Sequence, residues 1–276
     1  MRKRKSSLRR IVSAIFAVGV VVALIHIVHA LTLDRIIEYR EVDFSSPGIS
    51  AEMDGYRIAL ITDTHDISEE RLGAVVMELN ERRIDLLLLG GDYSSRSFDI
   101  LRTTMEMLSE VQTTDGAFGV AGNHDTLFDL YPTMEANGIT PLSNSGLHPR
   151  EGFFLAGVQD LQTGRPDVSR ATSGAMHGDF VLLLSHNPEI GMRQDTTGVD
   201  LILSGHTHGG QVTFFGLWAP ALAPRFGITR YGQRFMSGWA YSRDGTPVFV
   251  SNGTGEYFPR VFARPQVVLI TLRHEP

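Results

Sequence analysis

Histidine, aspartate and asparagine residues follow several short apolar runs of this 276-residue chain, and these residue types suit metal binding and proton transfer. His206 and His208 stand in the segment Ser-Gly-His-Thr-His-Gly-Gly-Gln, directly after the apolar run 201–203. Imidazole binds borderline transition metals, and the glycines let the backbone approach a ligand closely. The other members of the set are Asp63, His65, Asp92, Asn123, His124 and His186.

Carboxylates, imidazoles and an amide together suit a site with two metal ions, which a shared carboxylate can hold about 3.5 to 4 Å apart. Taken singly, each residue is more often a capping or hydrogen-bonding group. Because the residues recur at the ends of successive apolar runs, we interpret them as one site. Two divalent ions would offset phosphate charge and activate a bridging water, and a protonated imidazole could supply a proton to the leaving group. The set therefore predicts a two-metal site suited to hydrolysis.

The apolar runs predict the strands that must position this set. We expect strands over residues 36–44, 57–62, 84–89, 117–121, 153–158, 180–184, 201–203, 247–251 and 267–272. One helix is expected where Leu72, Val75, Val76 and Leu79 have helical spacing, and another over residues 98–111. Asp66 and Glu69 resemble a capping box before the first helix. Repeated strand, loop and helix units predict an α/β fold with the polar residues at the carboxyl edge of the strands, where such sheets bind ligands.

The amino-terminal region has a different character. Residues 11–31 carry no charge, and as a helix they would cover about 31 Å, roughly a bilayer core. Residues 1–10 form a basic tail that favours the cytoplasm, so we predict a single-pass cell-membrane protein with an extracytoplasmic catalytic domain. A cleaved export signal is the alternative, with a small-residue site at 28–30 and a degenerate twin-arginine pair at 9–10. Residues 32–54 are expected to hold a linker and the first strand, and residues 55–276 the catalytic domain.

Composition excludes several classes of function. Removing the six basic residues of the tail from the chain's 25 leaves 19 against 31 acidic residues, so nucleic acid is not an expected partner. The absence of cysteine excludes disulfides, thiolate metal sites and a cysteine nucleophile. The sequence also lacks the serine-hydrolase elbow and the P-loop.

Five ordered blocks resemble those of the calcineurin-like metallophosphoesterases. They are Asp-Thr-His at 63–65, Gly-Asp at 91–92, Gly-Asn-His-Asp at 122–125, Ser-His-Asn-Pro at 185–188 and Gly-His-Thr-His at 205–208. The resemblance covers residues from about 56 to 272. It implies a four-layer αββα sandwich, preceded here by the transmembrane helix, with the site at the carboxyl edges of the sheets.

The resemblance also assigns roles. It implies that one metal is bound by Asp63, His65, Asp92 and His208, and the other by Asn123, His186, His206 and the bridging Asp92. Asp92 and His124 would be the catalytic residues, with His124 contacting substrate and protonating the leaving group after attack by a metal-bridged hydroxide. The two divalent ions could be manganese, zinc, iron, nickel or cobalt, because availability decides more than ligand type at such sites.

Two further residues are candidates for substrate binding. The phosphoprotein phosphatases commonly have Gly-Asp-Tyr-Val-Asp-Arg-Gly in the second block, whereas residues 91–97 read Gly-Asp-Tyr-Ser-Ser-Arg-Ser. Ser95 replaces a carboxylate that orients the catalytic histidine in those enzymes, which disfavours protein phosphatase activity. Arg96 could contact phosphate or be a solvated surface residue. Gln211 could contact substrate or a water, or cap its own turn.

The segment Gly-Gly-Gln at 209–211 and the segment 251–260 resemble a membrane-associated bacterial branch of the family, which includes phosphodiesterases and UDP-2,3-diacylglucosamine pyrophosphatases of lipid A synthesis. We therefore predict hydrolysis of a phosphodiester or pyrophosphate bond in a lipid or cell-envelope substrate. The lipid A reaction is an alternative, and it conflicts with the predicted topology because it needs a site facing the cytoplasm. The same residues are also compatible with a catalytically silent metal-binding scaffold or with a nuclease.

Residues 214–226 form an apolar segment broken by prolines. Such a segment usually folds against its own domain. The functional alternative is a lid or groove for acyl chains, with Trp218 at the membrane interface.

Overall fold

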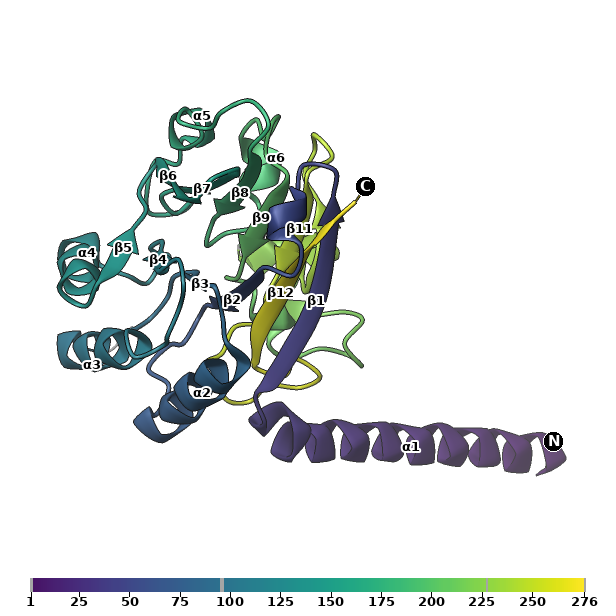
Figure 1. Ribbon diagram of the computed structural model, residues 1–276. Helices are drawn as coiled ribbons and strands as arrows, with labels where there is room; N and C mark the ends of the chain where they lie inside the picture. Colours follow the sequence, from purple (N-terminus) through teal and green to yellow (C-terminus); the bar gives the residue numbers. More distant parts are fainter. Residues whose placement is uncertain (1, 95–96, 227, 276) are drawn as a thin grey trace.

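Two six-stranded sheets pack face to face in the computed structural model, which describes residues 2–94, 97–226 and 228–275 (Figure 1). The first sheet has the order β1 (Glu38–Ser46), β12 (Gln266–His274), β2 (Arg57–Ile61), β3 (Leu86–Leu89), β4 (Ala117–Gly119) and β5 (Ile139–Pro141). Only the pairing of β12 with β2 is antiparallel among its described pairs.

The second sheet has the order β10 (Gly238–Tyr241), β11 (Pro247–Val250), β9 (Leu201–Ser204), β8 (Phe180–Leu184), β7 (Phe153–Gly157) and β6 (Ser145–Arg150). Its inner strands are parallel, and the described pairs at both edges are antiparallel. The carboxyl ends of β9, β8 and β7 therefore lie at one edge of this sheet, as those of β2, β3 and β4 do in the first.

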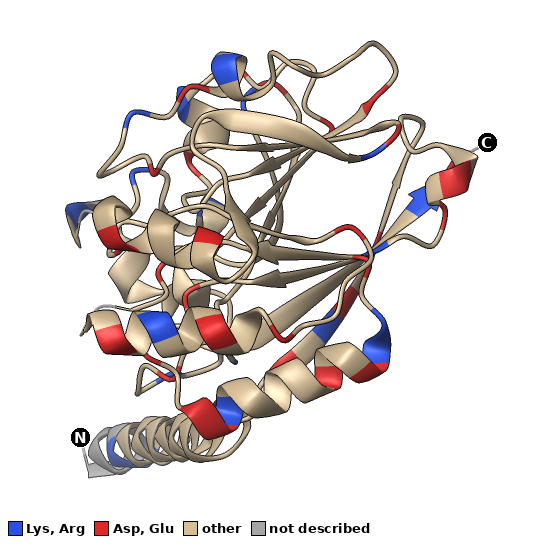
Figure 2. Cartoon of the chain, turned by 60° about the vertical axis from the view of Figure 1, so that its left-hand side comes forward, with Lys and Arg blue, Asp and Glu red and all other residues tan. Residues whose placement is uncertain are grey.

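Alternation along the strands divides the core into layers. In β2, Ile58 and Leu60 pack between the sheets, whereas Ala59 and Ile61 pack against the helices outside. Those helices are α2 (Glu69–Arg82), α3 (Phe98–Leu108) and α4 (Leu127–Ala136). Their charged residues are spread along the solvent side (Figure 2). The short helices α5 (Val168–Ala171) and α6 (Ile190–Arg193) contribute to the apolar cluster on the outer face of the second sheet. The expected four-layer αββα sandwich is thus confirmed.

Short 3₁₀ segments complete the elements: η1 (Leu33–Arg35), η2 (Ala51–Met53), η3 (His208–Gly210), η4 (Pro220–Leu222), η5 (Pro224–Phe226) and η6 (Gly232–Phe235). The expected strands and the two expected helices are present, with ends that shift by a few residues. The capping box was wrong. Helix α2 follows Ser68, which makes no side-chain cap, while Asp66 has a φ of 59° and accepts a hydrogen bond from Ser94 Oγ at 2.7 Å.

Helix α1 (Arg2–Leu31) extends away from the sandwich (Figure 1). The stretch Arg9–Arg35 is long and apolar enough to cross a membrane, and its most apolar window is not buried by the rest of the chain. The chain then enters β1, all nine residues of which pair with β12. The segment expected to hold a linker and first strand therefore ties α1 directly to the first sheet.

Candidate metal centre

The predicted ligands converge where the carboxyl edges of the two sheets meet. Asp63 and His65 follow β2, Asp92 follows β3, and Asn123 and His124 lie beyond β4. From the second sheet, His186 follows β8, and the pair His206 and His208 follows β9. The sheets are joined here by hydrogen bonds, because the backbone N–H of His206 donates to both Asp63 carboxylate oxygens at 3.0 and 3.1 Å.

Several ligands have left-handed backbone conformations. The φ angle is 51° at Asp63, 40° at His65 and 58° at Asp92. The two histidines after β9, His206 and His208, have φ angles of 71° and 51°. Such conformations cost of order 1–3 kcal/mol each and persist where the surroundings enforce them, as at functional sites.

Glycine makes the close approach of these loops possible. Gly91 has a φ of 96°, and a Cβ there would lie 2.5 Å from the backbone nitrogen of Gly122 and 2.8 Å from His186 Nδ1. No other residue would fit without displacing both neighbouring loops. The glycine of the Gly-Asp block is therefore required for Asp92 to lie between the two sheets.

The first half of the centre contains Asp63, His65 and His208, together with Asp92. His208 Nε2 lies 3.4 Å from Asp63 Oδ1, and His65 Nε2 lies 3.4 Å from Asp92 Oδ2. The two Nε2 atoms are 3.0 Å apart. One ligand atom from each of the four residues lies within 4.8 Å of all the others, which is compatible with a single cation between them.

The second half contains Asn123, His186 and His206, again with Asp92. His186 Nε2 lies 3.3 Å from Asp92 Oδ2, 3.1 Å from Asn123 Oδ1 and 3.2 Å from His206 Nδ1. The same Asp92 oxygen thus faces both halves, as expected of a bridging ligand.

Hydrogen bonds fix which imidazole nitrogens can bind metal. His186 Nδ1 donates to the carbonyl of Gly90 at 2.8 Å, and His208 Nδ1 donates to Gln211 Oε1 at 3.2 Å. In each ring this leaves the lone pair of Nε2 pointing into the centre. Nitrogen and oxygen donors of this kind suit manganese, iron, cobalt, nickel or zinc. The residues therefore fit two divalent cations, and the identity of the metal is left open.

Neighbouring histidines lower the pKa values of both aspartates of the centre. Burial would raise the pKa of Asp92, but the charge and hydrogen bond of His186 outweigh burial and lower that pKa to about 2. The pKa of Asp63 is likewise lowered against burial, by the hydrogen bond and charge of His208. Both carboxylates are thus ionised at neutral pH, as metal binding requires.

The histidines divide into two groups. Burial lowers the pKa of His65 and of His206 to about 4, with help from the neighbouring imidazoles. His186 differs because the charge and hydrogen bond of Asp92 overcome burial and raise its pKa to about 10. A proton on His186 must therefore leave before Nε2 can bind a metal.

Sequence reasoning quoted Asp125 within its block but gave it no role. Its carboxylate accepts hydrogen bonds from the backbone nitrogens of Asp92 at 2.7 Å, Tyr93 at 3.0 Å and Gly122 at 2.8 Å. Burial, together with the charge of Asp92, raises the pKa of Asp125 to about 6. Asp125 thus holds the loops after β3 and β4 together, which fixes Asp92 relative to Asn123.

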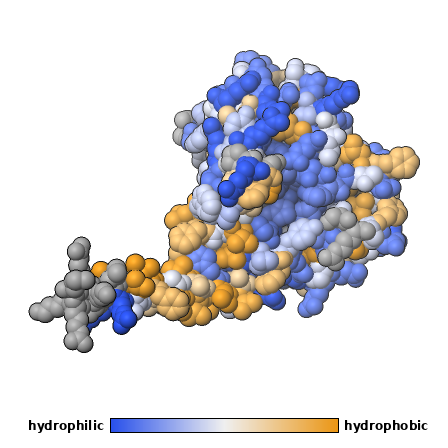
Figure 3. Space-filling view, turned by 180° about the vertical axis from the view of Figure 1, so that it is seen from behind, coloured by the Kyte–Doolittle hydropathy of each residue, from blue (hydrophilic) through white to orange (hydrophobic). Residues whose placement is uncertain are grey.

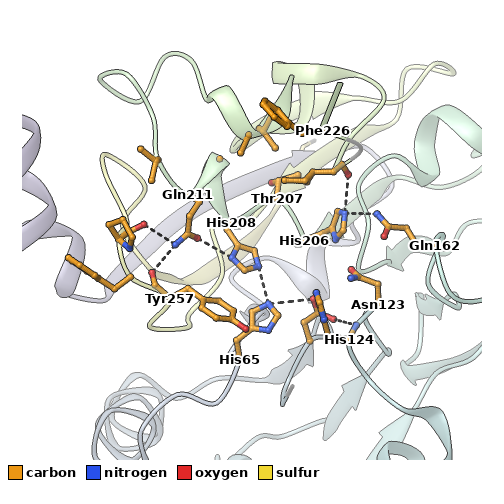
Figure 4. A pocket seen from close by; sticks show the side chains of 18 residues that line it. His65, Asn123, His124, Gln162, His206, Thr207, His208, Gln211, Phe226 and Tyr257 are labelled. Atoms are coloured by element: carbon orange, nitrogen blue, oxygen red, sulfur yellow. Dashed lines mark hydrogen bonds and ion pairs between the residues drawn. The ribbon is translucent and has the colours of Figure 1, made fainter. Parts of the chain in front are cut away.

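A cavity of about 600 Å³ opens over the centre (Figure 4). Candidate metal ligands and His124 belong to its lining. The lining also includes the apolar side chains of Val212, Ala221, Leu222, Phe226, Ile228 and Phe258. The exposed His124 is held by its backbone N–H, which donates to Asp92 Oδ1 at 2.8 Å.

The predicted substrate contacts have different surroundings. Gln211 lines the cavity, but its amide is also engaged, since Oε1 accepts from His208 and Nε2 donates to the carbonyls of Tyr257 at 2.8 Å and Pro259 at 3.0 Å. Arg96 and Ser95 lie outside the described residues. Sequence reasoning missed Gln162, whose Nε2 lies 3.1 Å from His206 Nε2 on the cavity wall. No sequence block marks Gln162, because it approaches His206 only in the folded chain.

The sequence pattern of the calcineurin-like phosphoesterases matches residues 56–210, more than half of the chain. The chain belongs to this family. An uncharacterised metallophosphoesterase of Bacillus subtilis is 29% identical over 87% of this chain and 86% of its own. A transmembrane protein with a metallophosphoesterase domain from Danio rerio is 26% identical over 97% of this chain and 63% of its own.

A Helicobacter pylori metallophosphoesterase is 28% identical over 77% of this chain, and the match spans only 58% of that relative's length. Among solved structures, the NAD nucleotidase NadN of Haemophilus influenzae matches 75% of this chain and 45% of its own, with a TM-score of 0.47 and 15% identity.

Proposed function

We propose that this protein is a membrane-anchored phosphohydrolase that uses two divalent metal ions to cleave a phosphodiester or pyrophosphate bond. The observation that carries the proposal is the position of Asp92 Oδ2, 3.4 Å from His65 Nε2 and 3.3 Å from His186 Nε2. When bound, the two ions would neutralise phosphate charge and lower the pKa of a water molecule. The full set of ligand side chains argues against a silent scaffold.

His124 is the proposed proton donor to the leaving oxygen. Its ring centroid lies 5.4 Å from that of His65, and its backbone is fixed by Asp92. The ring is exposed to the cavity, so it can contact a phosphoester without displacing a metal ligand. General acid catalysis of this kind typically contributes 10²–10⁴-fold to rate.

The test compares His124→Ala with a matched control, His177→Ala, at an exposed histidine remote from the described cavity. We expect the full-length, detergent-solubilised His124→Ala protein to retain both metals by elemental analysis. Its turnover should fall by roughly 10²–10⁴-fold on an alkyl phosphodiester, and by less on bis(p-nitrophenyl) phosphate, whose leaving group needs no proton. Metal loss in this variant, or an equal loss of turnover on both substrates, would contradict the role of proton donor.

A lipid or cell-envelope phosphoester is the proposed substrate class. The apolar side chains that line the cavity support this proposal, because they could contact an alkyl or acyl group of a substrate whose phosphate lies at the candidate metal ligands. The anchor supports it as well, since α1 would keep the cavity near lipids. The Danio rerio relative is named as a transmembrane protein, which is consistent with such an anchor.

The catalytic domain is proposed to lie outside the cytoplasm, because the basic tail precedes the span. Reporter fusions after residue 275, with alkaline phosphatase active outside the cytoplasm and a fluorescent protein active within it, would test this orientation. A cytoplasmic carboxyl-terminal domain would overturn it. That result would instead favour a pyrophosphatase acting on a lipid-linked nucleotide, the UDP-2,3-diacylglucosamine reaction being the leading example.

A further inference from the structure

Large apolar side chains are exposed on the body beside α1 and around the mouth of the cavity. Leu217 is 78% exposed, Phe214 53% and Trp218 48%. We call the apolar collar the set Phe214, Leu217, Trp218, Phe226, Ile228 and Phe258, all of them at least partly exposed. The last three also line the cavity. From behind, the apolar surface of α1 continues onto the adjoining part of the body (Figure 3). The sequence therefore leaves an apolar surface unburied between the anchor and the metal centre.

The collar contacts the helix before the helix ends. The ring centroid of His26 lies 5.5 Å from that of Phe214 and 4.5 Å from that of Phe215. His26 precedes Leu31, the last residue of α1, by five residues, which corresponds to about 7.5 Å along the helix axis. Phe214 of the collar therefore lies alongside the final turns of the stretch that is apolar enough to span a membrane.

Polar contacts hold this arrangement in place. Buried Asp34, just after α1, accepts hydrogen bonds from the backbone nitrogens of Phe262 at 2.9 Å and Ala263 at 3.1 Å. The same carboxylate lies 2.6 Å from His29 Nδ1, and the His29 ring stacks on Phe262 with centroids 3.8 Å apart. The guanidinium of Arg35 lies 4.9 Å from the ring centroid of Phe258. The anchor is thus packed against the collar rather than joined to it by a free tether.

We infer that the apolar collar inserts into the interface of the membrane that α1 crosses, so that the cavity opens at the level of the lipid headgroups. A depth of about 5–10 Å is typical of apolar groups that lie in this region, and it matches the position of His26 along α1. Tryptophan prefers the same region because its ring is apolar and its N–H is polar. The partner that the collar contacts is the lipid bilayer, since the collar adjoins the helix that is proposed to span it.

This insertion gives the proposed substrate class a route to the metals. A lipid phosphoester could keep its acyl chains among the collar side chains while its phosphate reaches Asp92 and His124. This consequence rests on the proposed function, whereas the insertion itself does not depend on turnover.

The two tryptophans of the chain provide the test and its internal control. Trp239 lies on β10 and stacks on Phe44, with ring centroids 5.7 Å apart. Phe44 is six residues beyond the start of β1, which is about 20 Å along the strand away from the α1 side. Full-length Trp239→Phe and Trp218→Phe proteins would each retain one tryptophan. Both would be reconstituted in phosphatidylcholine vesicles that contain lipids brominated at the upper acyl carbons.

We expect Trp218 fluorescence, observed in Trp239→Phe, to be quenched several-fold more strongly than Trp239 fluorescence, observed in Trp218→Phe. Equal quenching of the two tryptophans, or quenching of neither, would overturn the inference. Tryptophan quenching does not depend on phosphodiester cleavage. The result can therefore contradict the insertion of the collar without bearing on the proposed function.

A second measurement covers the case in which a tryptophan replacement perturbs folding. The chain contains no cysteine, so Leu217→Cys and Met176→Cys each give one labelling position. Met176 is 61% exposed and lies beyond α5, outside the collar. An environment-sensitive nitrobenzoxadiazole label should show a blue-shifted emission and protection from dithionite at position 217, and neither at position 176. Identical behaviour at both positions would refute the inserted collar.

Discussion

The two halves of the metal centre reach similar ligand sets by different means. In the second half, His186 is fully buried and its Nδ1 is fixed by the carbonyl of Gly90. In the first half, His65 Nδ1 is buried without a hydrogen-bond partner among the described residues, and its ring lies 4.7 Å from that of Tyr257. His186 is therefore oriented by a hydrogen bond but carries a proton, whereas His65 is held by packing and does not.

The orientation of a histidine ring and the charge of that ring therefore depend on different contacts at this site. The proximity of Asp92 that suits His186 for metal binding also raises its pKa to about 10. His65 and His206, with pKa values lowered to about 4, are ready to bind without losing a proton.

Removing the carboxylate that faces both halves should have the largest effect, because each half then loses a candidate ligand. We expect Asp92→Asn to lose metal from both halves and to lower turnover of bis(p-nitrophenyl) phosphate by roughly a thousandfold or more, since metal ions stabilise transition-state charge by several kcal/mol. Asp66→Asn is the control, because this neighbouring carboxylate lies outside both halves and bonds to Ser94. Retention of one ion at full occupancy in Asp92→Asn would show that the halves do not share their ligand.

Two glutamines allow the halves to be weakened separately. Gln211 accepts from His208 Nδ1 in the first half, and replacing it with alanine should lower metal affinity there by about 10–100-fold, as is typical for residues that orient a ligand. Gln162→Ala should affect the second half less, because the carbonyl of Ile228, 3.4 Å from His206 Nε2, can still accept a hydrogen bond from that ring in the variant. Titration of each chelator-treated variant with Mn²⁺ would compare them. A stronger effect from Gln162→Ala would reverse the assignment.

Release of the His186 proton on metal binding should be the smallest of these effects. It tests the difference between the two halves most directly. A raised pKa means that His186 is protonated from neutral pH up to about 10, so metal binding must displace that proton. The affinity of the second half should therefore rise about tenfold per pH unit between about pH 6.5 and 8.5. His65 of the first half should contribute no such rise, since its pKa is about 4. Calorimetric titrations in two buffers of different ionisation enthalpy would detect about one proton released. Heats independent of the buffer would contradict the prediction.

Much of the fold could be predicted because its buried strands are continuous apolar runs. Strand β8 is Phe180–Leu184, as its run predicts, and β2 differs from prediction by one residue. Helix α4 was missed because Pro132 interrupts its pattern, and β5, β6 and β10 were missed because they are short or largely polar. The capping box at Asp66 was wrong because a contact with Ser94, distant in sequence, competes with the local pattern.

The candidate site divides in the same way. The candidate ligands were predictable because each follows the end of an apolar run, where the family pattern places it. The residues that orient them were not. Asp125 bonds to a loop more than thirty residues away in sequence, and Gln162 meets His206 across 44 residues. These partners depend on how two sheets approach each other, which local spacing does not encode.

The order of the first sheet has a consequence for biosynthesis. Strand β12 lies between β1 and β2 and pairs with both of them. A growing chain makes β1 and β2 more than two hundred residues before it makes β12. Until then β1, the strand next to the anchor, has no place in the sheet. A nascent chain held by the proposed anchor would therefore wait for the whole domain to be synthesised, and closure of the sheet would be a late step for a membrane-tethered intermediate.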